Sequence, residues 1–133
     1  MRRRPGPRHA RADSRERGSA TVELTVILPV VLLLFFGLMQ GALISQGKAT
    51  AIAAAQEGAR IAAGESGSVS EGVAAARSFV AVSSLGSPAS GVTGARNAEE
   101  ATMTVTVRTK SVVPFWKPRI VQSASMPIER VTG

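Results

Sequence analysis

The sequence predicts an α+β fold, in which one long N-terminal helix crosses a membrane and continues beyond it. A small domain with a second helix and a short antiparallel β-sheet follows. Three features predict this arrangement: positions 24–47 carry no charge, positions 49–63 are rich in alanine, and positions 102–108 alternate between polar and apolar residues. These patterns are typical of a membrane span, a helix and a half-buried strand, respectively.

The first segment, positions 1–17, is rich in arginine, proline and glycine and lacks apolar periodicity, so we expect it to be disordered. The chain has a net charge of +7, and most of the excess lies in this segment. Basic residues beside a membrane span favour retention in the cytoplasm and attract anionic lipid. No nucleic-acid partner is expected, because the segment has no aromatic residue for base stacking. Positions 1–18 are therefore interpreted as a basic cytoplasmic leader.

The uncharged run at 24–47 is longer than the roughly 20 residues that cross the hydrocarbon of a bilayer. Its large apolar side chains favour insertion by about 4 to 8 kcal/mol in total, against a small penalty from polar groups such as Gln40. A buried helix of a soluble domain is the alternative, and the length of the run argues against it. We expect the segment to lie in the lipid bilayer.

One proline and a pair of glycines fall inside this predicted span. Pro29 removes one backbone donor and is expected to kink the helix, which membrane helices tolerate. Gly37 and Gly41 form a GxxxG pair, a spacing that lets two helix backbones approach closely. We interpret this pair as a candidate helix-packing face.

A glycine and a carboxylate lie just before the span, in the stretch GSATVE at 18–23. Gly18 has no side chain, so its backbone can enter a protease cleft in an extended form. Ser19 can cap a helix that starts there, and Glu23 favours the positive end of the helix dipole. In a bundle, Glu23 can also pair with the free amino terminus of a neighbouring subunit. The alternative for Glu23 is an acid that stays in the headgroup layer.

This stretch resembles a type IV prepilin processing site, where a membrane aspartyl peptidase cuts after glycine and Glu is the fifth residue of the mature chain. Cleavage after Gly18 would make Ser19 the new N-terminus and Glu23 the fifth residue. The wider pattern is similar to TadE-like pseudopilins of the tight-adherence (Tad/Flp) pilus family. The matching positions are Arg17-Gly18-Ser19, Val22-Glu23, Leu28-Pro29 and Phe36-Gly37.

The resemblance implies a structural protein, not an enzyme: a pseudopilin or minor-pilin-like component of a Tad-type pilus or secretion assembly, without a cofactor. The implied partners are other pilin or pseudopilin subunits, a prepilin peptidase, the assembly platform in the membrane and the lipid bilayer. Two positions depart from the pattern. Gln40 stands where the family often has Glu, and Ser19 stands where ordinary type IV pilins commonly have Phe.

The helix signal continues beyond the span, because positions 49–63 are rich in alanine and Gly64 suits a C-terminal cap. A helix over 19–63 is roughly 68 Å long, about twice the thickness of the hydrocarbon layer. It therefore projects well beyond the membrane. Its alanine-rich part lacks large side chains and suits close packing against other helices.

Positions 64–133 are expected to form a small extracytoplasmic α+β domain. Ser68 and Glu71 have the spacing of a capping box, which opens a second helix ending near Ser83. Positions 86–97 are rich in turn residues and are expected to form a mobile connection. The apolar face of the second helix, assigned to the core, consists of Val69, Val73, Ala76, Phe79 and Val80.

Two strands are predicted in the second half of this domain. The alternation at 102–108 predicts the first, and the weaker alternation at 119–128 predicts an antiparallel partner. Trp116 lies between them and is expected to pack the hairpin onto the second helix, because the domain has few other large side chains. An interfacial anchor and a ligand-stacking residue are the alternatives for Trp116.

The composition excludes several classes of catalytic site. There is no cysteine, and the one histidine, His9, lies in the basic leader. Thiol catalysis, thiolate metal sites, Ser-His-Asp triads and HExxH zinc sites are therefore excluded. No catalytic, cofactor-binding or metal-binding residue is predicted.

Two other functions share these features. An exported protein would be cut by signal peptidase at the A-x-A sequence 49–51, although its apolar core would normally be only about 7–15 residues long. An uncleaved single-span membrane anchor is the other alternative. The N-terminus of the mature protein separates the three hypotheses, since it would be Ser19, a residue near Ile52, or Met1. The pseudopilin would lie in the cytoplasmic membrane as a single-pass protein, with its N-terminus inside and its C-terminal domain outside. From there it could be incorporated in a surface pilus.

Overall fold

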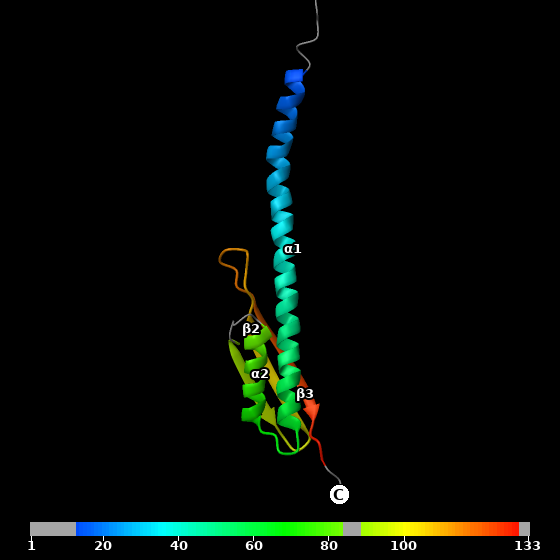
Figure 1. Ribbon diagram of the computed structural model, residues 1–133, viewed down its shortest axis with the longest axis vertical. Helices are drawn as coiled ribbons and strands as arrows, with labels where there is room; N and C mark the ends of the chain where they lie inside the picture. Colours follow the sequence, from blue (N-terminus) through cyan, green and yellow to red (C-terminus); the bar gives the residue numbers. More distant parts are fainter. Residues whose placement is uncertain (1–12, 84–88, 131–133) are drawn as a thin grey trace, which may run out of the picture. The chain divides into compact units, whose positions relative to one another are not determined.

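The computed structural model describes residues 13–83 and 89–130. The chain divides into two compact units, Met1–Leu38 and Met39–Gly133. A long apolar helix, a second helix and a three-stranded antiparallel sheet confirm the predicted α+β fold. The elements follow in the order α1 (Asp13–Ala63), α2 (Val69–Ser83), β1 (Gly91–Arg96), β2 (Glu100–Arg108) and β3 (Arg119–Pro127) (Figure 1).

Helix α1 begins at Asp13, before the predicted start at Ser19. The expectation of disorder over 1–17 is therefore wrong for Asp13–Arg17, whereas positions 1–12 lie outside the described residues. The physical reason is local. The sequence DSRER contains no glycine or proline and combines residues that favour a helix start with good helix formers.

Helix α1 ends at Ala63, directly before Gly64, as predicted. Gly64 does not adopt the left-handed conformation of a usual glycine cap. Instead, Arg96 of the sheet donates hydrogen bonds to the carbonyl oxygens of Gly64 (Nη2, 3.3 Å) and Gly67 (Nη1). The backbone N–H of Glu129 donates to the carbonyl oxygen of Ala63 (3.3 Å). The last carbonyl of α1 and the turn that follows it therefore have hydrogen-bond partners distant in the sequence.

Helix α2 opens with the predicted capping box. The backbone N–H of Ser68 donates to Glu71 Oε2 (2.9 Å), and the backbone N–H of Glu71 donates to Ser68 Oγ (3.3 Å). This reciprocal pair satisfies two of the N–H groups that a helix start leaves free. Ala76 and Val80 are buried and Val73 and Phe79 are half-buried against the core, which confirms the predicted apolar face.

The sheet has the order β1-β2-β3, with both pairs antiparallel. The two predicted strands are confirmed as β2 and β3. Along β2, Ala101, Met103, Val105 and Val107 are buried. The residues between them form the other face, where Thr102 and Thr104 share hydroxyl hydrogen bonds of 2.7 and 3.1 Å with Ser125 and Ser123 of β3. One face of the sheet is therefore apolar and covered, and the other is polar.

Strand β1 corrects one expectation. The predicted mobile connection over 86–97 is wrong for Gly91–Arg96, which pair with β2 along their whole length. Asn97 closes the hairpin, because its Oδ1 accepts the backbone N–H groups of Glu99 (2.8 Å) and Glu100 (2.7 Å). Small, turn-forming residues thus form a strand because β2 offers them backbone partners and not because of their intrinsic propensity.

Small side chains form much of the core in the Met39–Gly133 unit. The alanine-rich part of α1 is packed as predicted. A Cβ atom placed on Gly72 would lie 2.5 Å from the carbonyl oxygen of Gly58, so α1 and α2 approach backbone to backbone at this point. Met103, the largest fully buried side chain, packs beside the same contact. The buried alanines of α1 are Ala51, Ala54, Ala55, Ala59, Ala62 and Ala63.

Trp116 corrects a second expectation. The indole was predicted to pack the hairpin onto the second helix, but it is 51% exposed and lies in the loop between β2 and β3. The close approach of α1, α2 and the sheet explains this, because Met103 and the alanines already fill the space between them. The sequence-based assignment of Trp116 to the core is therefore wrong.

Gln40 is a buried polar residue of α1, only 3% exposed. Its Oε1 accepts hydrogen bonds from Ser111 Oγ (3.0 Å) and from the backbone N–H of Val112 (3.0 Å). Its Nε2 is buried and has no hydrogen-bond partner among the described residues. Because Val112 N–H needs an acceptor, the contact also sets the orientation of the amide. Gln40 therefore holds the loop between β2 and β3 against α1.

We expect Gly72→Ala to destabilise the domain by about 1–3 kcal/mol, because the new methyl group meets the Gly58 carbonyl and Met103 in an already filled core. Thermal or denaturant unfolding measures the effect. Ser78→Ala, at an exposed position of the same helix, serves as the control. If both variants are stabilised, helix propensity outweighs packing and the proposed tight contact is incorrect.

We expect Gln40→Leu to release the loop by removing the acceptor of Val112 N–H. For a lost hydrogen bond worth about 1 kcal/mol, amide hydrogen exchange at Val112 should become about five-fold faster. Gln56→Leu, an exposed position on the same helix, is the matched control and should leave this exchange unchanged. Equal exchange in the two variants would contradict the assigned role of Gln40.

Candidate functional site

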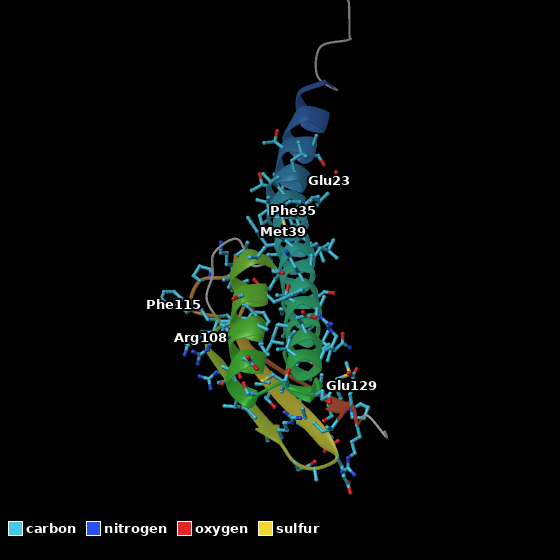
Figure 2. All side chains as sticks on the ribbon, turned by 60° about the horizontal axis from the view of Figure 1, so that its bottom comes forward. Glu23, Phe35, Met39, Arg108, Phe115 and Glu129 are labelled. Carbon is cyan, nitrogen blue, oxygen red and sulfur yellow. The ribbon has the colours of Figure 1, made fainter. Side chains whose placement is uncertain are left out.

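The first candidate site is the surface of α1 within the Met1–Leu38 unit. Every valine, leucine, isoleucine and phenylalanine between Val22 and Leu38 is between 44% and 77% exposed. These side chains stand out around the helix, with Phe35 labelled among them (Figure 2). A helix that is apolar on all sides is suited to lipid or to the interior of a helix bundle. We call this set of residues the apolar surface of α1.

Length and composition support a membrane span here. Within the described residues, one helix is long and apolar enough to cross a bilayer, over Gly18–Ala63, and its most apolar window is not buried in the structure. A soluble protein rarely exposes a continuous apolar surface of this kind. The chain therefore has the features of a single-pass membrane protein.

The residues predicted for processing lie at the start of this surface, all within α1. Ser19 and Glu23 are both exposed and are four residues apart, which places them on one side of the helix. Among the residues that the structure describes, none forms a hydrogen bond or ion pair with the Glu23 carboxylate. A Cβ placed on Gly18 would meet nothing within 4 Å, so packing inside the chain does not require this glycine.

The glycines of α1 fall into two groups. A Cβ placed on Gly37 or on Gly41 would also meet nothing within 4 Å, whereas one on Gly47 or Gly58 would clash with neighbouring residues of the chain. Gly47 and Gly58 are therefore required by internal packing. Their packing role was not predicted from the sequence, although the small residues around Gly58 are a signal of close packing. Gly37 and Gly41 remain free for a contact outside the chain.

The second candidate site is the loop between β2 and β3. Val113 O accepts a hydrogen bond from Trp116 N–H (3.4 Å), with Pro114 and Phe115 between them. Phe115 has a positive φ of 68°, so this turn resembles type II, in which glycine or asparagine normally occupies that position. A bulky residue there costs about 1–3 kcal/mol. Phe115 nevertheless faces solvent completely and makes no packing contact that offsets the strain (Figure 2).

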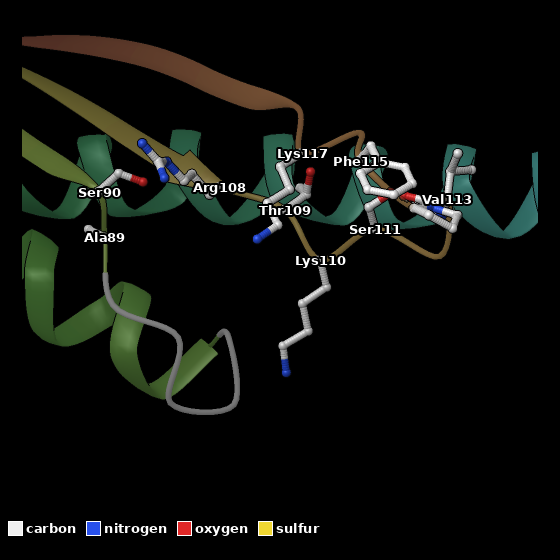
Figure 3. A pocket seen from close by; sticks show the side chains of 10 residues that line it. Ala89, Ser90, Arg108, Thr109, Lys110, Ser111, Val113, Phe115 and Lys117 are labelled. Atoms are coloured by element: carbon white, nitrogen blue, oxygen red, sulfur yellow. The ribbon is translucent and has the colours of Figure 1, made fainter.

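A hollow of about 620 Å³ lies beside this loop. Figure 3 shows the side chains that line it, which include the cations Arg108, Lys110 and Lys117 and the hydroxyl groups of Ser90 and Ser111. Such a set of donors favours an anion. It contains no carboxylate or imidazole that could act as a general base. The described residues also contain no group of three or more histidines or acids that could hold a metal ion.

Comparison of the sequence with known protein families gave one match, and it lies within α1. A family model described as TadE-like protein matches residues 18–60. No match was found among curated proteins or among solved structures. The matched segment contains the predicted processing residues Gly18 and Ser19, the carboxylate of Glu23, and the whole apolar surface of α1. The family is structural and pilin-like. Residues 18–60, about a third of the chain, are therefore similar to the TadE-like family, whose members are associated with the Tad pilus.

Proposed function

We propose that this protein is a pseudopilin or minor-pilin-like subunit of a Tad-type pilus or secretion assembly. The observation that carries the proposal is the exposed apolar surface of α1, which begins at Val22 and contains the carboxylate of Glu23 near its start. Nothing in the described residues covers this surface, and both lipid and a bundle of identical helices would cover it. A subunit that moves from the lipid bilayer into a helix bundle needs a helix that is apolar on all sides.

The proposed topology follows from charge. Positions 1–18 form the cytoplasmic leader, the span lies at about 24–47 within the helix 19–63, and positions 64–133 form the extracytoplasmic domain. The excess of arginine before Gly18 holds the N-terminus in the cytoplasm. The C-terminal domain is then presented outside the cytoplasmic membrane, where it reaches a pilus and its other subunits.

Processing is proposed to occur after Gly18, by a prepilin peptidase. Gly18 lies inside a helix, so the peptidase must first unwind the backbone there. Glycine makes this easier, because it is about 1 kcal/mol less favourable than alanine in a helix. A Cβ at Gly18 would face open space, so no packing among the described residues competes with processing as the reason for this glycine.

Assembly is proposed to depend on Glu23 and on the small residues of the span. After cleavage, Ser19 carries a free amino group, and Glu23 of one subunit can pair with this group of the next. An ion pair at 4 Å is worth about 1 kcal/mol in water and about 4 kcal/mol at an effective dielectric constant of 20. Gly37 and Gly41 then let neighbouring helices approach at their backbones. The proposed partners are other pilin or pseudopilin subunits and the assembly platform in the membrane.

The N-terminal sequence of the protein extracted from membranes tests the processing step. We expect it to start at Ser19, and we expect Gly18→Leu to retain the leader because a side chain blocks the extended backbone from the cleft. Gly37→Leu, a matched glycine in the same helix, should still be processed. A start at Met1 in the unchanged protein would support an uncleaved anchor, and a start near Ile52 would support an exported protein.

Cross-linking tests the assembly step. The chain contains no cysteine, so Leu38→Cys supplies a single exposed thiol that reports on helix contacts between subunits. In that background we expect Glu23→Gln to lower the cross-linking yield by roughly ten-fold, which corresponds to ~1.4 kcal/mol. Glu57→Gln, which removes an acid outside the span, is the control and should have no effect. Equal yields for both variants would contradict the role of Glu23.

A further inference from the structure

The loop between β2 and β3 exposes a group of apolar residues that the proposed assembly does not use. Phe115 is fully exposed, Trp116 is half-exposed, and Val112 and Val113 are also exposed. Together with Pro114 they form the tip of the loop. Because Phe115 has a strained backbone and makes no compensating packing contact, the fold alone does not explain why this residue is aromatic.

The contact with Gln40 indicates where the tip lies along α1. Ser111 and Val112 are hydrogen-bonded to the Gln40 side chain, and Gln40 belongs to the uncharged run at 24–47. A bilayer's hydrocarbon takes up roughly 20 residues of a helix, so the proposed span at about 24–47 ends about three to seven residues beyond Gln40. The tip therefore lies beside the part of α1 that approaches the outer surface of the membrane.

The charges around the tip match a phospholipid surface. Arg108, Lys110, Lys117 and Arg119 flank the tip, and no acidic residue lies between Glu100 and Glu129. The first three of these cations line or border the hollow beside the loop (Figure 3). Tryptophan and lysine are both typical of the boundary between hydrocarbon and headgroups, where the ring enters the apolar layer and the ammonium group reaches the phosphates.

We propose that this loop is a second membrane contact, in which its tip enters the outer leaflet and the cations beside it bind the phosphate groups of anionic lipids. The inference rests on the membrane span of the proposed function, because Gln40 places the tip at the bilayer only if α1 crosses it. The contact fixes the C-terminal domain against the membrane until the subunit leaves the bilayer.

Trp116 is the only tryptophan in the chain, so its fluorescence reports on the loop alone. The full chain is reconstituted in vesicles of phosphatidylcholine with phosphatidylglycerol. We expect a blue-shifted emission that is quenched by lipids brominated near the glycerol end and protected from aqueous iodide. Extraction with alkaline carbonate reports separately on α1, which should remain in the membrane.

The other outcomes overturn the inference in distinguishable ways. If iodide quenches Trp116 freely while α1 resists extraction, the loop contact is wrong and the span stands. If protection of Trp116 depends on the ratio of protein to lipid, the tip contacts a second copy of the chain instead of lipid. If carbonate extracts the protein, the span fails, and with it both the proposed function and this inference.

Variants separate a lipid contact from a structural role. Phe115→Asn should reduce the protection of Trp116 while leaving the melting temperature unchanged or higher, because asparagine tolerates a positive φ. Val82→Gln, at an exposed apolar position of α2, is the control and should leave Trp116 protected. A lower melting temperature for Phe115→Asn with unchanged protection would assign Phe115 to the fold.

The lysines test the lipid headgroup. Lys110→Gln and Lys117→Gln should each shift the ratio of protected to exposed Trp116 by about five-fold toward the exposed form in anionic vesicles. In vesicles of phosphatidylcholine alone the same substitutions should have little effect. An equal effect in both kinds of vesicle would show that these cations do not bind anionic lipid.

Discussion

One continuous helix has to serve two environments in this protein, and the side chains of α1 divide accordingly. From Leu24 to Leu38 they are mostly large, apolar and exposed, whereas from Ala51 to Ala63 they are mostly small and largely buried. The small residues let the backbones of α1 and α2 meet at Gly58 and Gly72. Much of the C-terminal domain follows from that contact, because it leaves room in the core for Met103 but not for an indole.

The sequence was most informative where a pattern has a local cause. The capping box at Ser68 and Glu71, the end of α1 at Ala63 and the alternation in β2 depend on neighbouring residues, and the structure confirms all three. The predicted start of α1 at Ser19 was wrong, because the arginine- and proline-rich composition of the whole leader concealed a short helix-forming stretch at its end. The disorder prediction treated positions 1–17 as one segment, although the composition of Asp13–Arg17 differs from that of the residues before it.

The sequence was least informative where the cause lies far away along the chain. Strand β1 exists because β2 supplies backbone partners, and Trp116 is exposed because alanines of α1 occupy the core. Neither effect is visible in a local pattern. The processing and assembly roles of the residues around Gly18 stay predictions, which rest on a short motif and on the span that follows it. The contact between Gln40 and the loop joins positions 71 and 72 residues apart and had no sequence signal.

The buried alanines of α1, between Ala51 and Ala63, determine where the domain can be separated from the membrane span. A water-soluble fragment of this domain requires removal of the exposed apolar part of α1. A truncated chain must retain α1 at least from Ala51 onward, because the methyl groups of its alanines form one side of the hydrophobic core. A fragment starting at α2 would expose the other side, including Met103 and Val80, and would be prone to aggregate.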